Sequence, residues 1–450
     1  MTMTGTVMNP LSGDPKGSPT KLRAAIGSGI GTTVENYDFV AYGTAAALYF
    51  GTVFFEDTDP VVGVLLAFAT YAVGFVARPL GGIVGGILGD RIGRRPVLIA
   101  SLILMGLATT AVGVLPTYHQ VGILAPILLV LVRIVQGFAF GAEWGGAVLM
   151  TYEHAPWNRK GLFCAIPQMG VPAGNMLAAL AFLLSAGLPG DWAWRVPFLV
   201  SFVLVFVGIF IRMNVAESPA FEAVKDVGQV SKNPLKAVLR DDWRNLIRAM
   251  LLRATENAGY AIGITYVSSF VIQVNPEHRS LAATSIAIAA AVGIFAVPLW
   301  AMLTDRIGRR SVYLIGSSMM IIIAVPVFLL VNTGLVGPTI IAFLATFCLV
   351  ENCLAAAQPT WFSELFPTNT RATGVSTAYQ VAAVIGGFMP AVAVGLFVAL
   401  DWFGPALLYA AFGVLGLVTS LLTRETLPRD RRERIKQLMA EHESMQKEKA

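Results

Sequence analysis

Two carboxylates stand one helical turn apart in a stretch of sequence that is otherwise almost uncharged. Glu35 and Asp38 belong to TTVENYDFVAYG, inside the apolar run 24–50. A helix has 3.6 residues per turn, so Gly31, Glu35, Asp38 and Tyr42 form one stripe, with the two acids about 4.5 Å apart along the axis. Two acids this close in an apolar medium cannot both ionise cheaply. The pair is therefore a candidate proton carrier that titrates as a unit.

Eight ionisable residues fall inside apolar stretches of the chain. Such a residue at a bilayer centre costs about 2.5 to 3.5 kcal/mol on insertion scales, so it normally faces a cavity or a partner. The eight are Glu35, Asp38, Arg78, Arg133, Glu143, Arg253, Glu256 and Glu351. All but Arg78 lie in the first, fourth, seventh and tenth stretches, so the costly groups are concentrated on four elements.

The candidate proton-coupling groups are Asp38, Glu35 and Glu351. Asp38 leads because it lies nearer the centre of its stretch, and Glu351 has no obvious local partner in the sequence. The alternative for the first two is a structural pair held permanently ionised by Arg78 or Arg133. The alternative for Glu351 is a neutral, packed carboxyl.

Arg133 is the candidate anion-binding residue. A guanidinium keeps its proton in proteins, and its planar fork suits a carboxylate through two hydrogen bonds. It would bind a substrate carboxylate, or that of Asp38 in an empty cavity, and this competition would couple proton and substrate. The alternative is a static salt bridge that joins the first, second and fourth stretches.

Other polar residues in the apolar stretches are candidate substrate contacts or interhelical hydrogen-bonding groups. Arg253 and Glu256, three residues apart, are expected to neutralise each other, and Arg78 and Glu143 to be structural charges. The candidate substrate contacts are Arg133, Gln136, Tyr42, Gln168, Asn257, Tyr260 and Asn352.

The elements that must position these residues are membrane-spanning helices. Of the 450 residues 56% are hydrophobic and 13% charged, with a mean hydropathy of +0.69, whereas soluble domains carry about 25% charged residues. A helix needs about 20 apolar residues to cross about 30 Å of hydrocarbon. The sequence predicts an all-α polytopic protein with twelve transmembrane helices, near 24–50, 62–89, 97–114, 123–150, 162–186, 194–213, 246–272, 281–303, 312–331, 337–358, 374–398 and 402–423.

The distribution of basic residues predicts the orientation. With both termini cytoplasmic, 27 of the 32 Lys and Arg residues fall in inside segments, as the positive-inside rule requires. The basic residues of the inside segments account for the pI near 9.1, so no nucleic-acid partner is needed to explain it. The three cysteines have neither metal nor disulfide spacing, and no phosphate-binding loop supports ATP-driven pumping. We expect no cofactor other than a coupling proton.

The chain repeats itself at long range. GILGDRIGRR ends at Arg95 and AMLTDRIGRR ends at Arg310, an offset of 215 residues, and EHAPWNRKG and ELFPTNTRATG are offset by 211. Such self-similarity predicts two six-helix halves. The expected division is a tail (1–23), a first half (24–213), a cytoplasmic linker with short interfacial helices (214–245), a second half (246–423) and a tail (424–450).

These motifs carry a family resemblance. G-x-x-x-D-R-x-G-R-R resembles the signature loop of the major facilitator superfamily. ENYDFVAYG, ARPLGG, RIVQGFAFGAEWGG, WAWRVPF, ESPAF and ELFPTNTRATG are similar to the metabolite:H+ symporter family, over about residues 24–425. Asn36 departs from the pattern, because the family usually has an aromatic residue there. The resemblance implies alternating access around a cavity lined by the first, fourth, seventh and tenth helices.

By the same resemblance, charged loop residues form a cytoplasmic gate of ion pairs between the halves. The gate candidates are Asp90, Arg91, Arg94, Glu153, Arg159, Asp305, Arg306, Arg309, Glu364 and Arg371. The glycines of GGIVGGILG, Gly137, Gly141, Gly145 and the pair 386–387 are expected to permit close helix packing.

The residues and this resemblance together predict a monomeric, proton-coupled importer of a small organic acid similar to shikimate, and the resemblance implies the inner bacterial membrane. The first rival is a proton symporter of a zwitterionic compatible solute such as betaine or proline, which would favour acidic and aromatic contacts. A remote rival is a sensor with a transport fold, favoured only by the charged tail.

Overall fold

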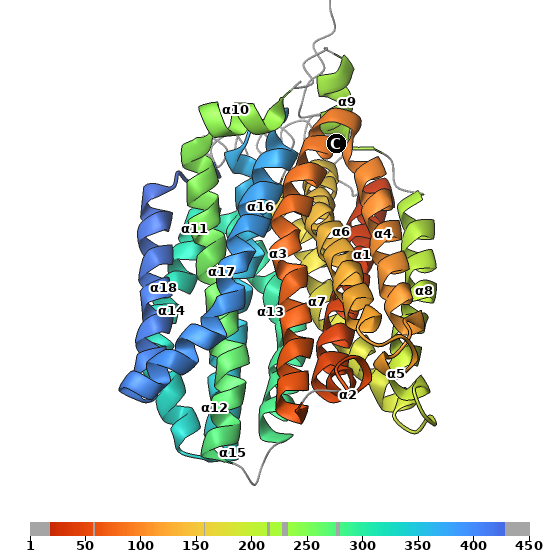
Figure 1. Ribbon diagram of the computed structural model, residues 1–450. Helices are drawn as coiled ribbons and strands as arrows, with labels where there is room; N and C mark the ends of the chain where they lie inside the picture. Colours follow the sequence, from red (N-terminus) through yellow and green to blue (C-terminus); the bar gives the residue numbers. More distant parts are fainter. Residues whose placement is uncertain are drawn as a thin grey trace, which may run out of the picture.

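The computed structural model describes residues 19–56, 59–156, 158–213, 217–226, 233–275 and 280–427. Most of both predicted tails, residues 1–18 and 428–450, and part of the predicted linker lie outside the described residues. Within the described ranges the chain is helical and forms one upright bundle (Figure 1).

The first half contains six long helical stretches. The first is continuous through α1 (Pro19–Ala45), a π-helical turn (Ala46–Phe50) and α2 (Gly51–Phe54). The others are α3 (Pro60–Ile92), α4 (Arg94–Val114), α6 (Leu124–His154), α7 (Lys160–Ser185) and α8 (Trp192–Met213), and the short α5 (Tyr118–Val121) precedes α6.

The second half repeats this arrangement. Its first stretch joins α11 (Trp243–Tyr260), a π-helical segment (Ala261–Tyr266) and α12 (Val267–Val274). Its fourth joins α15 (Val336–Leu344), a π-helical segment (Ala345–Glu351) and α16 (Asn352–Leu365). The others are α13 (Ser280–Ile307), α14 (Arg309–Asn332), α17 (Arg371–Leu400) and α18 (Phe403–Leu422). The prediction of twelve spanning helices is confirmed over the described residues.

Ten of these helices are long and apolar enough to cross a membrane by composition alone. The first and seventh stretches are not among the ten. They hold the intramembrane charges Glu35, Asp38, Arg253 and Glu256, which lower their mean hydropathy. All four of these side chains are largely buried inside the bundle, so they avoid contact with lipid.

The two halves meet mainly along two helix pairs, α3 with α17 and α7 with α13, with further contacts of α16 and α17 with α6 and of α16 with α7. Figure 1 shows α3 and α17 side by side at the centre of the view. Small residues allow the close approach: a Cβ on Gly86 of α3 would lie 2.7 Å from the Cα of Thr373 on α17. Gly137 and Gly141 of α6 likewise approach the backbone of α3, whereas a Cβ on Gly387 would meet no atom within 4 Å, so close packing does not explain that glycine.

The predicted linker contains two short helices, α9 (Pro219–Asp226) and α10 (Pro234–Asp241). Both lie at the end of the bundle, at the top of Figure 1, that also carries the two GRR turns, residues 93–95 between α3 and α4 and residues 308–310 between α13 and α14. We call this the charged end, because Asp90, Arg94, Asp305 and Arg309 lie there.

Candidate functional site

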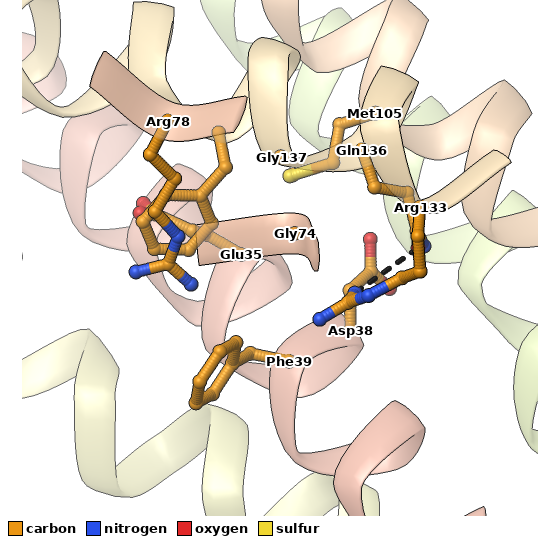
Figure 2. Close-up of a pocket in the computed structure, with 10 residues that line it drawn as sticks. Glu35, Asp38, Phe39, Gly74, Arg78, Met105, Arg133, Gln136 and Gly137 are labelled. Carbon is orange, nitrogen blue, oxygen red and sulfur yellow. Dashed lines mark hydrogen bonds between the residues drawn. The ribbon is translucent and has the colours of Figure 1, made fainter. Parts of the chain in front are cut away.

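A small cavity lies within the first half. It has a volume of about 20 Å³ and is lined by residues of α1, α3, α4 and α6, among them Glu35, Asp38, Arg78, Arg133 and Gln136. This is room for about one water molecule. Figure 2 shows Glu35 beside Arg78 at one side of the cavity and Asp38 beside Arg133 at the other. The cavity is too small for an organic substrate, but it suits a proton or a water.

A chain of hydrogen bonds runs along the wall of this small cavity. Thr109 Oγ1 of α4 donates to Asp38 Oδ2 at 2.7 Å, and Gln136 Nε2 donates to Thr109 Oγ1 at 2.7 Å. Arg133 Nη1 donates to Gln136 Oε1 at 3.1 Å. Asp38 is thus linked to Arg133 through two neutral side chains. Sequence reasoning missed Thr109, because a single hydroxyl in an apolar helix gives no signal of its own.

Arg133 is enclosed by aromatic rings. Its Cζ lies 3.9 Å from the ring centroid of Tyr42 and 5.1 Å from that of Tyr71, and its Nη2 donates to the Tyr71 carbonyl. Gly74 makes room, since a Cβ there would lie 2.9 Å from Nη2. The side chain is 4% exposed. Arg133 therefore faces Asp38 and the tyrosines in the interior of the first half.

A second, large cavity lies between the two halves. Its volume is about 540 Å³, within the range of about 300 to 1,000 Å³ typical of small-molecule sites. The first half contributes α1, α3, α6 and α7, and the second contributes α11, α13, α16, α17 and the two π-helical segments. The cavity is large enough for one metabolite.

The large cavity brings together some of the predicted residues and not others. Those that line it are Glu35, Arg78, Gln168, Arg253, Glu256, Asn257, Tyr260, Glu351 and Asn352. Those that do not are Asp38, Tyr42, Arg133, Gln136 and Glu143. Residues that sequence reasoning had not assigned to a site also line it, including Asn175, Trp144, Tyr379 and Asn36, the position that departs from the family pattern.

Two arginines reach the large cavity in different settings. The Cζ of Arg78 lies 3.6 Å, 4.1 Å and 4.8 Å from the ring centroids of Phe140, Phe75 and Phe39, so its guanidinium is caged by phenyl faces. Arg253 forms the predicted ion pair with Glu256. Both arginines are largely buried, and each presents a cation to the cavity.

Glu351 stands at the end of the π-helical segment in the tenth helical stretch. It is 7% exposed, and its Oε2 has no hydrogen-bond partner among the described residues. Its neighbour Asn352 donates to the Gly293 carbonyl at 3.4 Å. An acid is thus buried in the wall of the large cavity with spare hydrogen-bonding capacity.

The two cavities share a wall. Glu35, Phe39, Arg78 and Phe140 line both of them. Glu35 and Asp38 lie on one stripe of α1, yet Glu35 reaches both cavities and Asp38 reaches the small one alone. A change of charge in the small cavity therefore alters the electrostatic potential most directly at Glu35 and Arg78, which also line the large cavity.

At the charged end, carboxylates of each half bind backbone amides of the other. Asp90 accepts hydrogen bonds from the amides of Ala372 and Thr373 at 3.1 Å and 2.8 Å. Asp305 accepts from the amides of Gly161 and Leu162 at 2.8 Å and 3.1 Å. Each acid caps the first turn of a helix, α17 or α7, where free amides and the helix dipole favour an anion.

The arginines of the GRR turns form ion pairs mainly within their own half. Arg94 pairs with Asp90 and Glu153, and Arg309 pairs with Asp305 and Glu364. Within the part of the chain that the structure describes, Arg371 of the second half forms an ion pair with Glu153 of the first, at 3.2 Å. The gate was predicted to consist of ion pairs between the halves, but most of its crossing contacts are hydrogen bonds to backbone.

A second layer of acids supports these arginines, and sequence reasoning missed its symmetry. Glu217 accepts from the amides of Arg94 and Arg95, and Glu425 accepts from those of Arg309 and Arg310. The next residues repeat the pattern, since Ser218 donates to Glu153 and Thr426 donates to Glu364. The sequence signal for this symmetry was the pair of short motifs after the last helix of each half, ESP from Glu217 and ETLP from Glu425.

Three gate candidates lie at the surface. Arg159, the counterpart of Arg371, is exposed. Arg91 is exposed and its Nη2 donates to Asn233 at 3.3 Å, and Arg306 is exposed as well. The inner set at this end therefore comprises Asp90, Arg94, Glu153, Asp305, Arg309, Glu364 and Arg371.

The family model described as Major Facilitator Superfamily matches residues 38–390, which is most of the chain. The chain belongs to the major facilitator superfamily. The resemblance seen in the loop motifs is thereby confirmed, and the two six-helix halves are those of this superfamily.

Curated relatives of this major facilitator protein are transporters. The inner membrane metabolite transport protein YhjE of Escherichia coli (strain K12) is 36% identical over 90% of this chain and 94% of the relative. The shikimate transporter of the same strain is 34% identical over 90% of this chain and 94% of that transporter. The proline/betaine transporter of Salmonella typhimurium (strain LT2) is 32% identical over 91% of this chain and 85% of that transporter. The protein is thus a membrane transporter of metabolites and not an enzyme.

Solved structures share the fold of this major facilitator protein. The proton:xylose symporter XylE, bound to 6-bromo-6-deoxy-D-glucose, superimposes with a TM-score of 0.71 over 91% of this chain and 97% of that one, at 17% identity. A double tryptophan mutant of XylE gives a TM-score of 0.73. Identity this low supports the twelve-helix fold alone.

Proposed function

We propose that this transporter imports a small organic acid together with protons, by alternating access in the bacterial inner membrane. The observation that carries the proposal is the pair of cavities with a common wall. The large cavity has the size of a metabolite site and presents two arginines, and the small cavity holds a buried carboxylate, Asp38. Glu35 and Arg78 connect them. The relatives named above transport a metabolite, shikimate, and proline or betaine.

Arg78 and Arg253 are the proposed contacts of the substrate carboxylate. Both line the large cavity, whereas Arg133 does not. Asn257, Tyr260, Gln168 and Asn352 surround the same space and supply neutral hydrogen-bonding groups for the rest of the molecule. Arg133 is better placed to act on Asp38, through Gln136 and Thr109, than on a substrate.

Protonation of Asp38 is the proposed coupling step. A carboxylate at Asp38 balances Arg133 across the small cavity, and a neutral carboxyl leaves that cation uncompensated. The altered field acts on Glu35 and Arg78 in the shared wall, and through them on an anion in the large cavity. Proton and substrate would then favour each other's binding, with reciprocal coupling.

The proposed orientation places the charged end in the cytoplasm, with both termini on that side and the protein acting as a monomer. Basic residues of the loops then obey the positive-inside rule. The capped contacts of Asp90 and Asp305 then close the cytoplasmic end, and in this proposal substrate enters the large cavity from the opposite side. No cofactor is invoked beyond the proton.

A zwitterionic compatible solute is the second candidate substrate. Glu351 favours it, because a buried acid with a free oxygen, near the rings of Tyr260 and Phe347 in the cavity wall, suits a cationic head group. The proline/betaine relative points the same way.

The test uses purified protein in proteoliposomes. External alkalinisation is measured on addition of shikimate, 2-oxoglutarate, citrate, benzoate, betaine or proline, for wild type, Asp38→Asn and Glu351→Gln. We expect one acid to drive proton entry in wild type, and Asp38→Asn to exchange that acid without moving protons. Glu222→Gln, on the exposed face of α9, is the matched control.

Each alternative has its own result in this test. Proton entry driven by betaine or proline, abolished in Glu351→Gln, would replace the organic acid with the zwitterion. Undiminished proton entry in Asp38→Asn would remove Asp38 from the coupling step. Absence of movement for every compound in a preparation that binds them would favour a sensor.

A further inference from the structure

Two aromatic side chains from opposite halves are stacked in the wall of the large cavity. Trp144 lies on α6 and Tyr379 on α17, with ring centroids 3.2 Å apart and planes inclined by 14°. The side chains are 5% and 9% exposed. Because one ring belongs to each half, this contact must break when the halves separate here.

Arg253 holds the other face of the tyrosine. Its Cζ lies 3.7 Å from the centroid of the Tyr379 ring. The indole already occupies one face of that ring, so the guanidinium lies against the opposite face. Arg253 also pairs with Glu256 on the same helix, α11, which fixes the direction of its side chain. The phenol ring is therefore clamped between an indole and a cation.

The stack lies between the large cavity and the charged end. Trp144 and Tyr379 both line the cavity. One residue along α6, a Cβ on Gly145 would overlap Ser376 of α17, so the two helices touch directly beyond the stack. The ion pair of Arg371 with Glu153 lies farther toward the charged end. Arg371 precedes Tyr379 on α17 by eight residues, which is about 12 Å of helix.

We propose that Tyr379, clamped between Trp144 and Arg253, is an inner gate of the large cavity, and that Arg253 is its positioning residue. The gate closes the cavity toward the charged end, inside the ion pairs and helix caps. Cation–π and stacking contacts both require the ring to stay in place. Loss of either contact favours the conformation that is open at the charged end.

Arg253 also links the gate to the contents of the cavity. A carboxylate binds a guanidinium best through two parallel hydrogen bonds, which need the edge of the guanidinium plane and a matching orientation. Arg253 already donates to Glu256, so a bound organic acid competes with Glu256 for that edge, shifts the guanidinium relative to the ring and loosens the stack. This link rests on the proposed function, whereas the gate itself does not.

The test measures access to the cavity from the charged end. Ala355 is half-buried and lines the cavity, so Ala355→Cys is introduced after the three native cysteines are replaced by alanine. A membrane-impermeant maleimide is applied from each side of sealed vesicles. We expect Tyr379→Ala to raise labelling from the charged end about three- to tenfold, from the loss of one aromatic stack and one cation–π contact.

Two variants control for the ring and for folding. Tyr379→Phe keeps the stacked ring, and its labelling should stay within about twofold of the parent. Trp144→Leu removes the stack from the opposite half and should reproduce the rise, which keeps the test open if Tyr379→Ala does not fold. Labelling unchanged by the loss of either ring, while Arg371→Ala raises it, would overturn the gate.

The role of Arg253 is tested by charge-preserving substitution. Arg253→Lys keeps a cation beside Glu256 and leaves the stack with Trp144 in place but loses the planar face, so we expect a rise in labelling that is smaller than that of Tyr379→Ala. The double variant should show no rise beyond that of Tyr379→Ala, because removal of the ring already removes the contact with Arg253. Labelling of Arg253→Lys at the parental level, or a multiplied effect in the double variant, would contradict the positioning role.

The last arm separates the gate from the substrate. These measurements need no substrate, so the gate is tested even if no organic acid is transported. With Arg253 intact, shikimate, 2-oxoglutarate, citrate and benzoate are added in turn, and a transported acid should raise labelling. If Tyr379→Ala raises labelling but no added acid does, the gate stands and the link to a carboxylate falls.

Discussion

Asp90 of α3 accepts a 2.8 Å hydrogen bond from the backbone amide of Thr373 on α17, so an acid of one half caps a helix of the other. The repeat of this contact joins Asp305 of α13 to the amide of Gly161 at the start of α7, also at 2.8 Å. Both contacts can exist only while the charged end is closed. They tie the conformational equilibrium of the transporter to two helix caps.

Replacing these acids should open the charged end. An N-cap lost to alanine costs about 0.5 to 2 kcal/mol, which is about a two- to thirtyfold shift in an equilibrium. We expect Asp90→Ala and Asp305→Ala to raise maleimide labelling of Ala355→Cys from the charged end by such factors. Asp90→Asn keeps an acceptor oxygen and should have a smaller effect. Equal effects of Asn and Ala would show that charge, and not the cap, holds the contact.

The two copies of the other repeated loop motif, EHAPWNRKG and ELFPTNTRATG, should respond differently to mutation of their arginines. Arg371 is 14% exposed at its side chain and pairs with the buried Glu153, whereas its counterpart Arg159 is exposed. A hydrogen bond to a charged group is worth about 1.5 to 3 kcal/mol, so Arg371→Ala should raise labelling at least about tenfold. Arg159→Ala should stay within about twofold, as surface substitutions do. A similar rise in both variants would indicate a symmetric gate.

The internal repeat made much of the charged end predictable. Matching the two GRR turns located Asp90, Arg94, Asp305 and Arg309 in equivalent places, and the structure groups them so. The partners of the two acids were not predictable in the same way, because backbone amides have no signature in the side-chain sequence. Extending the repeat beyond the helices would have paired Glu217 with Glu425.

Helical spacing predicted the stripe on α1 but not what each residue faces. Glu35 and Asp38 were expected to act as one pair, yet the packing of α4 and α6 against α1 leaves Asp38 lining only the small cavity, whereas Glu35 lines both cavities. The same packing places Arg133 there. Which cavity a buried charge reaches depends on contacts between helices distant in sequence, and no local pattern records those contacts.

The glycines of the two GRR turns should be intolerant of substitution. Gly93 and Gly308 each have φ of +107°, and a Cβ would overlap Glu217 or Glu425. Such a backbone is strained for any side chain, at about 1 to 3 kcal/mol. We expect Gly93→Ala and Gly308→Ala to lower the melting temperature of the detergent-purified protein. Gly337→Ala is the matched control, since a Cβ there meets no atom within 4 Å. A melting temperature equal to that of the control would refute the overlap.

Thr109 gives the most selective test of the small cavity. Its hydroxyl donates to Asp38 and accepts from Gln136, so Thr109→Val removes both contacts while keeping the shape of the side chain. A hydrogen bond to a charged group is worth about 1.5 to 3 kcal/mol, so proton-driven uptake should fall at least about tenfold. Exchange of substrate without a proton gradient should change much less, because Thr109 does not line the large cavity. Thr109→Ser keeps the hydroxyl and should transport like wild type. Equal losses of uptake and exchange in Thr109→Val would mean that the residue supports the fold of the first half and not the coupling of protons to substrate.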